Sequence, residues 1–154
     1  VTSPWGNELV VATPLNSKIT DFKWKDVASD DVKTILIGDP GTAPFGRYAK
    51  QVFESTGLWD KVRDKIATKK HITLLAEVLG DSNANTIGIL FLSNLDDSLR
   101  VIYTIDKSWH SPIRYYLAPI KNSKETSHAG SLLEFIQSDV AKEVFLAEGF
   151  KAEN

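Results

Sequence analysis

Two short, almost continuously apolar runs constrain the fold of this 154-residue chain more than any other feature of the sequence. They lie at residues 32–37 and 87–92, and apolar residues recur at helical spacing between them. An unbroken apolar run is typical of a strand buried on both faces of a parallel sheet, because half-exposed strands alternate. Strands that alternate with helices favour an α/β architecture. We therefore expect a mixed, mostly parallel sheet flanked by helices.

The remaining elements follow from the same patterns and from their stop signals. We expect further strands at 8–13, 101–105 and 114–120, and a short helical turn at 22–27. Helical spacing and caps predict four more segments: a helix that Gly57 ends; a short one through Leu58, Trp59, Val62 and Ile66; one from Ile72 to Gly80; and a helical region from Thr126 with Ser138 as an N-cap and Gly149 as its end.

Composition excludes several classes of protein. A formal net charge of −2 provides no basic field for nucleic acid or an acidic membrane. The chain has no cysteine and no methionine, so thiolate chemistry is absent and we expect a processed product or a fragment. The three histidines lack metal-binding spacing, and no nucleophile motif is present. We expect no metal site, no cofactor and no enzymatic activity.

A glycine-rich loop, GDPGTAPFGRYAK, follows the first apolar run at residues 38–50. Gly41 and Gly46 have the spacing of a phosphate loop, but Arg47 and Tyr48 replace its lysine and its hydroxyl residue. Pro44 also removes a backbone donor. The loop is therefore interpreted as a simple strand-to-helix turn or as an anion contact made by backbone at a helix start.

The anion hypothesis depends on main-chain donors. Proline at the first helical position leaves the N–H groups of Phe45, Gly46 and Arg47 free at the positive end of a helix. Ile72 opens a second helix after the basic stretch Thr68-Lys69-Lys70-His71. These basic residues could favour an anion nearby, but a solvated basic face is the commoner explanation for such a stretch.

Four ordered segments give the chain a resemblance to the molybdate-binding proteins of bacterial ABC importers. They are GNELVVATP, IGDPGTAPFGRYAKQVFESTGLWDKV, the pair ITLLAEVL and IGILFLSNL, and SLLEFIQSDVAKEVFLAEGF, and from the first to the last they span residues 6–150, nearly the whole chain. The most specific is the loop segment with the following GLWD. The resemblance implies a periplasmic-binding-protein-like lobe over residues 1–120, and C-terminal helices over 121–154 that pack on a first lobe.

The resemblance also implies a ligand and a site. A tetrahedral oxyanion such as molybdate or tungstate would be held by neutral donors in a cleft, with backbone contacts from Phe45 and Ile72. Gly46, next to Phe45, is a further candidate ligand-binding residue. The position of the family's cleft tyrosine is Phe91 here, so that hydroxyl is absent. Phe45 is larger than the small residue usual at its position. Implied partners are the membrane subunits of an ABC importer, and the implied location is periplasmic or otherwise exported.

The resemblance implies that this chain lacks the first lobe of the family, and with it about half of the ligand shell. We therefore expect an incomplete or degenerate binding lobe whose terminal helices meet a second copy or a separate first-lobe chain. The residues expected to lack a partner are Leu132, Leu133, Ile136, Val140, Val144 and Phe145. Two alternatives stay open: an effector-sensing lobe of a transcription regulator, and an interaction module that has lost ligand binding.

Overall fold

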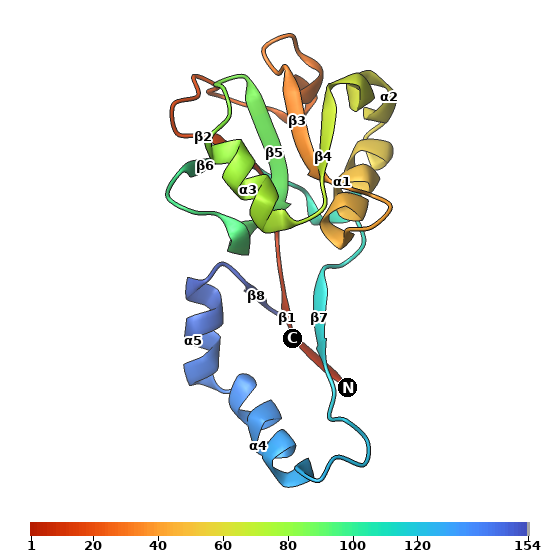
Figure 1. The fold of residues 1–154 in the computed structure, drawn as a ribbon, viewed down its shortest axis with the longest axis vertical. Helices are drawn as coiled ribbons and strands as arrows, with labels where there is room; N and C mark the ends of the chain where they lie inside the picture. Colours follow the sequence, from red (N-terminus) through yellow and green to blue (C-terminus); the bar gives the residue numbers. More distant parts are fainter. Residues whose placement is uncertain (154) are drawn as a thin grey trace. The chain divides into compact units, whose positions relative to one another are not determined.

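The structure, a computed structural model, describes residues 1–153 (Figure 1). It divides into two compact units, one made of residues 9–111 and the other of residues 1–8 together with 112–154. The resemblance implies a different division, into a lobe over residues 1–120 and C-terminal helices over 121–154, and that division remains a prediction.

Unit 9–111 is built on a five-stranded mixed sheet in the order β4-β3-β5-β2-β6. β3 is parallel to both β4 and β5, whereas β2 is antiparallel to β5 and β6. Only β2 therefore runs against the other four strands, which confirms the mixed, mostly parallel sheet. The strands are β2 (Leu9–Pro14), β3 (Thr34–Gly38), β4 (Ile66–Lys69), β5 (Thr86–Phe91) and β6 (Leu99–Thr104).

Helices pack on this sheet and complete its core. α3 lies across β5 in Figure 1, and its buried Leu75 and Leu79 share an apolar cluster with Leu36 of β3 and Leu90 of β5. The helical elements are η1 (Trp24–Ala28), α1 (Pro44–Ser55), α2 (Trp59–Val62), η2 (Arg63–Lys65), α3 (Ile72–Gly80), η3 (Leu92–Asn94) and η4 (Lys107–Trp109).

One expectation in this unit is wrong. Ile66 was expected to continue a short helix, but it opens β4 and pairs in register with Ile35 of β3. The apolar spacing from Val62 to Ile66 fits one helical turn, and β4 has only four residues, too few to show a strand pattern. Pairing with β3 therefore decides the conformation of this segment.

The second unit carries a three-stranded antiparallel sheet in the order β7-β1-β8. Its elements are β1 (Thr2–Gly6), β7 (Arg114–Leu117), α4 (Thr126–Ile136), α5 (Asp139–Ala147) and β8 (Lys151–Ala152). The expected N-cap of α5 is confirmed, since Ser138 Oγ accepts a hydrogen bond from the Ala141 N–H at 3.3 Å. Gly149 has a φ of 86°, which suits a residue that ends a helix.

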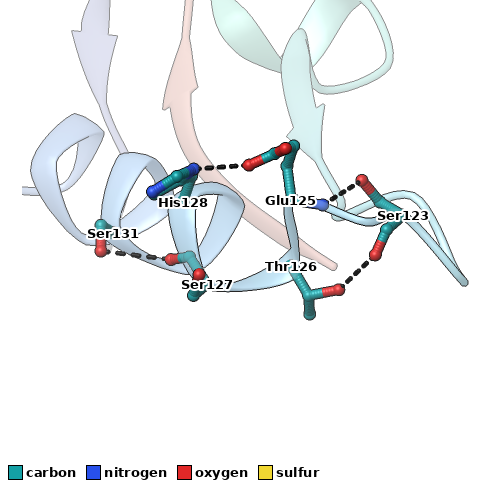
Figure 2. Close-up of polar contacts among 6 residues, drawn as sticks. All are labelled: Ser123, Glu125, Thr126, Ser127, His128 and Ser131. Atoms are coloured by element: carbon teal, nitrogen blue, oxygen red, sulfur yellow. Dashed lines mark hydrogen bonds and ion pairs between the residues drawn. The ribbon is translucent and has the colours of Figure 1, made fainter.

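Local polar contacts fix the start of α4 (Figure 2). The Thr126 hydroxyl donates to the Ser123 carbonyl at 2.7 Å, and the Glu125 N–H donates to Ser123 Oγ at 3.2 Å. Glu125 Oε2 also lies 2.6 Å from His128 Nδ1, one turn into the helix. These short-range contacts determine where the helix begins without requiring a tertiary partner.

The helices α4 and α5 present large apolar side chains to solvent. Val140 and Val144 of α5 are 64% and 60% exposed, and Leu132 and Phe135 of α4 are each 57% exposed. Phe145, in contrast, stacks on Trp5 of β1 with ring centroids 4.4 Å apart. The expectation of an uncovered stripe is therefore wrong for Phe145, and Leu133 and Ile136 are half-buried. Among residues 1–153, no helix is both long and apolar enough to cross a membrane.

Candidate anion-binding pocket

Two helices begin at the same edge of the five-stranded sheet. α1 follows β3 after a five-residue loop, and α3 follows β4 after only Lys70 and His71. Because β3 and β4 are parallel neighbours, their carboxyl ends, and the helices that follow, meet at one edge. The topology therefore brings two helix starts together within unit 9–111.

A pocket of about 570 Å³ lies between these two helix starts. The α1 side contributes residues 42–45 and the α3 side contributes residues 70–73. Phe45 and Ile72, the two backbone donors implied by the resemblance, therefore line one pocket. Gly46 belongs to the first turn of α1 without lining the pocket. Phe91 does not line it either, but its ring centroid lies 6.4 Å from that of Phe45.

The start of α1 offers fewer donors than the sequence suggested. Its N-cap is Ala43, which has no side-chain acceptor, and Pro44 has no N–H. The N–H groups of Gly46 and Arg47, expected to be free, both donate to the Ala43 carbonyl at 3.1 Å. The Phe45 N–H finds no hydrogen-bond acceptor in the described part of the chain. One main-chain donor, and not three, is therefore unpaired at this helix start.

The start of α3 supplies more donors. Its N-cap is His71, whose side chain makes no capping hydrogen bond, and whose carbonyl accepts from the Leu75 N–H at 3.0 Å. Within residues 1–153, no acceptor pairs with the N–H groups of Ile72, Thr73 or Leu74. Unpaired N–H groups at a helix start carry a partial positive charge that favours an anion.

Phe45 combines a main-chain donor with a buried ring. The side chain is 5% exposed and belongs to the same apolar cluster as Leu75 and Leu90. A methyl group added at Gly38 would lie 2.7 Å from the Phe45 ring, so the end of β3 must be glycine to admit it. The large residue at this position is therefore accommodated in the core.

Side chains that sequence analysis did not assign to the site also line the pocket: Thr42, Lys70, His71 and Thr73. Sequence analysis gave Lys70 and His71 two interpretations, a basic stretch near an anion and a solvated basic face, and favoured the second. These two residues connect a parallel strand to the helix that follows it. This position in the sequence could have indicated that they line the pocket. Among the described residues, no group of three or more histidine, aspartate and glutamate side chains could hold a metal ion.

A second pocket, of about 490 Å³, lies at the other end of the strands. It is lined by Val32, just before β3, and by Asn85, just before β5. Asp26 and Asp31 also line it, and no helix of the α1 or α3 kind begins there. The two carboxylates outnumber the one lysine of its lining, Lys18, so this pocket suits an anion less well than the pocket at the helix starts.

Comparison with known proteins identifies the relatives of this chain. The sequence profile of the bacterial extracellular solute-binding protein family matches residues 1–151. A Bacillus subtilis lipoprotein, named as a candidate ABC transporter substrate-binding protein, is 30% identical over 150 residues, which cover 96% of this chain and 56% of that protein. The molybdate-binding protein ModA of Haemophilus influenzae is 25% identical over 154 residues, covering 96% and 59% of the two chains.

A solved structure agrees with these relatives. The substrate binding domain of a candidate molybdenum ABC transporter from Clostridium difficile superposes with a TM-score of 0.87 at 29% identity. The match covers 99% of this chain and 66% of that one. The chain spans less than two thirds of the length of both curated relatives. The expected fold class is therefore confirmed, on a chain shorter than those it resembles.

Proposed function

Because this chain belongs to the bacterial extracellular solute-binding protein family, we propose that it is the ligand-contacting lobe of an ABC-importer binding protein for a tetrahedral oxyanion, molybdate or tungstate. The family consists of binding proteins, so the expectation that the chain is not an enzyme holds. Relatives named for molybdate support the choice of ligand.

One observation carries this proposal: two helix starts with unpaired N–H groups line one pocket. Phe45 contributes one donor from α1, and Ile72 and Thr73 contribute donors from α3. Such groups stabilise a dianion without a counter-charge, because the dipoles are fixed in the direction of the ligand. An oxyanion with four acceptor oxygens can accept from both sides at once.

The proposal extends to the cellular setting. We infer an exported, periplasmic or membrane-tethered protein that delivers its ligand to the membrane subunits of an ABC importer. Relatives described as extracellular or lipoprotein binding proteins support this inference. Nucleic acid is not an expected partner, because the net charge of −2 gives no attraction to a polyanion.

We further propose that another chain covers α4 and α5. The exposed helix residues, defined as Leu132, Phe135, Val140, Val144 and Leu146, are between 45% and 64% exposed. Burying one such side chain contributes about 1.5 to 3 kcal/mol, so leaving all five in water is costly. A first lobe on a separate chain, or a second copy of this chain, would remove them from solvent.

Amide chemical shifts test the ligand proposal directly, because they detect millimolar binding that calorimetry would miss. Titration of the isotope-labelled chain with molybdate or tungstate should shift the Phe45, Ile72 and Thr73 amides and leave those of α5 in place. Sulfate serves as the smaller oxyanion for comparison. Calorimetry with the same three anions then gives the affinity. Failure of every anion to move these amides would favour the interaction module that has lost ligand binding.

A further inference from the structure

The pocket has an unbalanced charge. Lys70 and His71 are basic, and none of the eight residues that line the pocket is acidic. The closest acidic residue in the two loops is Asp39, whose Oδ1 is occupied by the Gly41 N–H at 2.9 Å. In the described part of the chain, no ion pair within 4.0 Å involves any of these three side chains. Among the described residues, Lys70 therefore adds a positive charge beside two helix starts without a carboxylate partner within 4.0 Å.

We propose that Lys70 sets the charge selectivity of the pocket, favouring dianions over monoanions of the same shape. This inference rests on the proposed function and concerns the same pocket. The resemblance implies a shell of neutral donors only, which ranks tetrahedral anions by size and hydrogen bonding. A lysine at the pocket adds a Coulomb attraction that grows in proportion to the charge of the ligand and weakens with salt.

The exposure of Lys70 limits the size of this effect. Its side chain is exposed at the pocket wall, so solvent screens it, and the attraction is weaker than that of a buried ion pair. The measurements are made at pH 8, where histidine side chains in general carry little charge. Lys70 is the lysine among the described residues that line the pocket, and its ammonium group keeps its charge there.

Tungstate and perrhenate form the discriminating ligand pair, because both are tetrahedral oxyanions but carry two charges and one charge, respectively. The Lys70→Gln variant should lose affinity about 10-fold for tungstate and about 3-fold for perrhenate at low salt, as expected for an interaction proportional to ligand charge. Raising the salt to physiological strength or above should shrink the tungstate loss, as counter-ions screen the lysine. Amide titration provides both dissociation constants.

Lys69→Gln is the matched control. It removes the same formal charge one residue away, but Lys69 is the last residue of β4 and does not line the pocket. Because Lys69 does not line the pocket, its charge lies farther from the ligand and is screened more by solvent and salt, so its effect on either anion should stay below about 2-fold.

The possible outcomes separate this inference from the proposed function. If Lys70→Gln lowers the affinity for tungstate and perrhenate by the same factor, the selectivity inference is overturned. It is also overturned if Lys69→Gln lowers these affinities as much as Lys70→Gln does. Both results would leave oxyanion binding in place. If tungstate and molybdate fail to shift the pocket amides of the unmodified chain, the proposed function and this inference are both overturned.

Discussion

The rings of Phe45 and Phe91 lie with their centroids 6.4 Å apart and their planes inclined by 59°. Phe45 lines the pocket, whereas Phe91 ends β5 and is half-buried beside it. Tyr48 also contacts Phe91, with ring centroids 6.2 Å apart. The rings of Phe45, Tyr48 and Phe91 therefore form an aromatic cluster, called the aromatic wall below. The family resemblance places a tyrosine hydroxyl at position 91 of this cluster.

Phe91→Tyr tests whether this wall faces the ligand. If it does, the new hydroxyl should tighten oxyanion binding by about 1.5 to 3 kcal/mol, the contribution of one hydrogen bond to a charged group. The dissociation constant for molybdate, from amide titration or calorimetry, measures the change. Phe22→Tyr makes the same chemical change at the second pocket and should leave affinity unaltered. An unchanged affinity in Phe91→Tyr would mean that this side chain points away from the ligand.

Gly46→Ala should destabilise the fold. A methyl group at Gly46 would contact the Gly38 carbonyl and lie 2.7 Å from the carbonyl carbon of Asp39, and both neighbours are backbone. The start of α1 would have to move away from β3, at a cost of about 1 to 3 kcal/mol, as for other overpacked sites. Urea denaturation provides the free energy of unfolding.

Gly41→Ala is the control for this substitution, since its one close neighbour is the mobile carboxylate of Asp39 at 3.3 Å. Its free energy of unfolding should change by less than about 1 kcal/mol. Equal destabilisation in both variants would show that loop flexibility, and not the close approach of α1 to β3, is the reason for glycine at position 46.

Asp106 should make the stability of the η4 turn depend on pH. The pKa of its carboxyl is lowered because the carboxylate accepts hydrogen bonds from the Ser108 N–H and then from the Ser108 hydroxyl, at 2.9 and 2.8 Å. A group with a lowered folded-state pKa stabilises the fold above its unfolded pKa, and this contribution disappears as pH falls through the folded-state value. The window therefore lies below about pH 4.

Asp106→Asn keeps an oxygen acceptor and removes the titration. Thermal melts of both proteins between pH 7 and pH 3 should show the wild-type advantage shrinking toward the acidic end. A constant difference between the two melting temperatures would contradict the assignment of the pH dependence to this carboxylate.

Ser138→Ala should destabilise α5 by about 1 kcal/mol, because the hydroxyl oxygen caps the helix by accepting from the Ala141 N–H. Circular dichroism during urea denaturation measures this loss. Ser131→Ala in α4 is the comparison, since its hydroxyl only donates to the Ser127 carbonyl one turn back (Figure 2). That change should be neutral or slightly stabilising, because alanine favours the helix interior. Matching losses in both variants would contradict the capping role.

The exposed helix residues predict association. Light scattering should give a mass above that of one chain, or an apolar dye should bind where the partner is absent. The double substitution Leu132→Glu and Val144→Glu should reduce both signals, while Lys142→Glu, which alters charge on the same helix, should preserve them. A strict monomer that binds no dye would contradict the proposal of a covering chain.

Sequence patterns predicted long-range architecture better than short strands. The continuous apolar runs located β3 and β5, and Gly57, with a φ of 71°, ended α1 as expected. β1, β4 and β8 were missed because their residues form neither a continuous apolar run nor an alternating pattern, and pairing with another strand decides their conformation. Local pattern holds too little information to predict such strands.

The candidate site was predicted in outline for a similar reason. Proline at the start of α1 and the position of Ile72 identified both helix starts from sequence. The two helix starts share one pocket because β3 and β4 pair in parallel. This pairing could not be predicted, because β4 was not predicted as a strand. The Gly46 and Arg47 N–H groups both donate to the Ala43 carbonyl. This depends on the exact backbone geometry of the first helical turn, which no sequence pattern specifies.

The pairing of β1 with β8 joins residues near opposite ends of the sequence, since Trp5 lies opposite Ala152 and Gly6 opposite Lys151. Unit 9–111, by contrast, is one continuous stretch that contains every residue of the candidate pocket. During synthesis on a ribosome, the pocket can therefore form while β1 still waits for its partners to be translated. We expect the discontinuous unit to fold last, because β7 and β8 follow residue 111 in the chain. The nascent chain would then contain a folded pocket before the sheet of β1, β7 and β8 has formed.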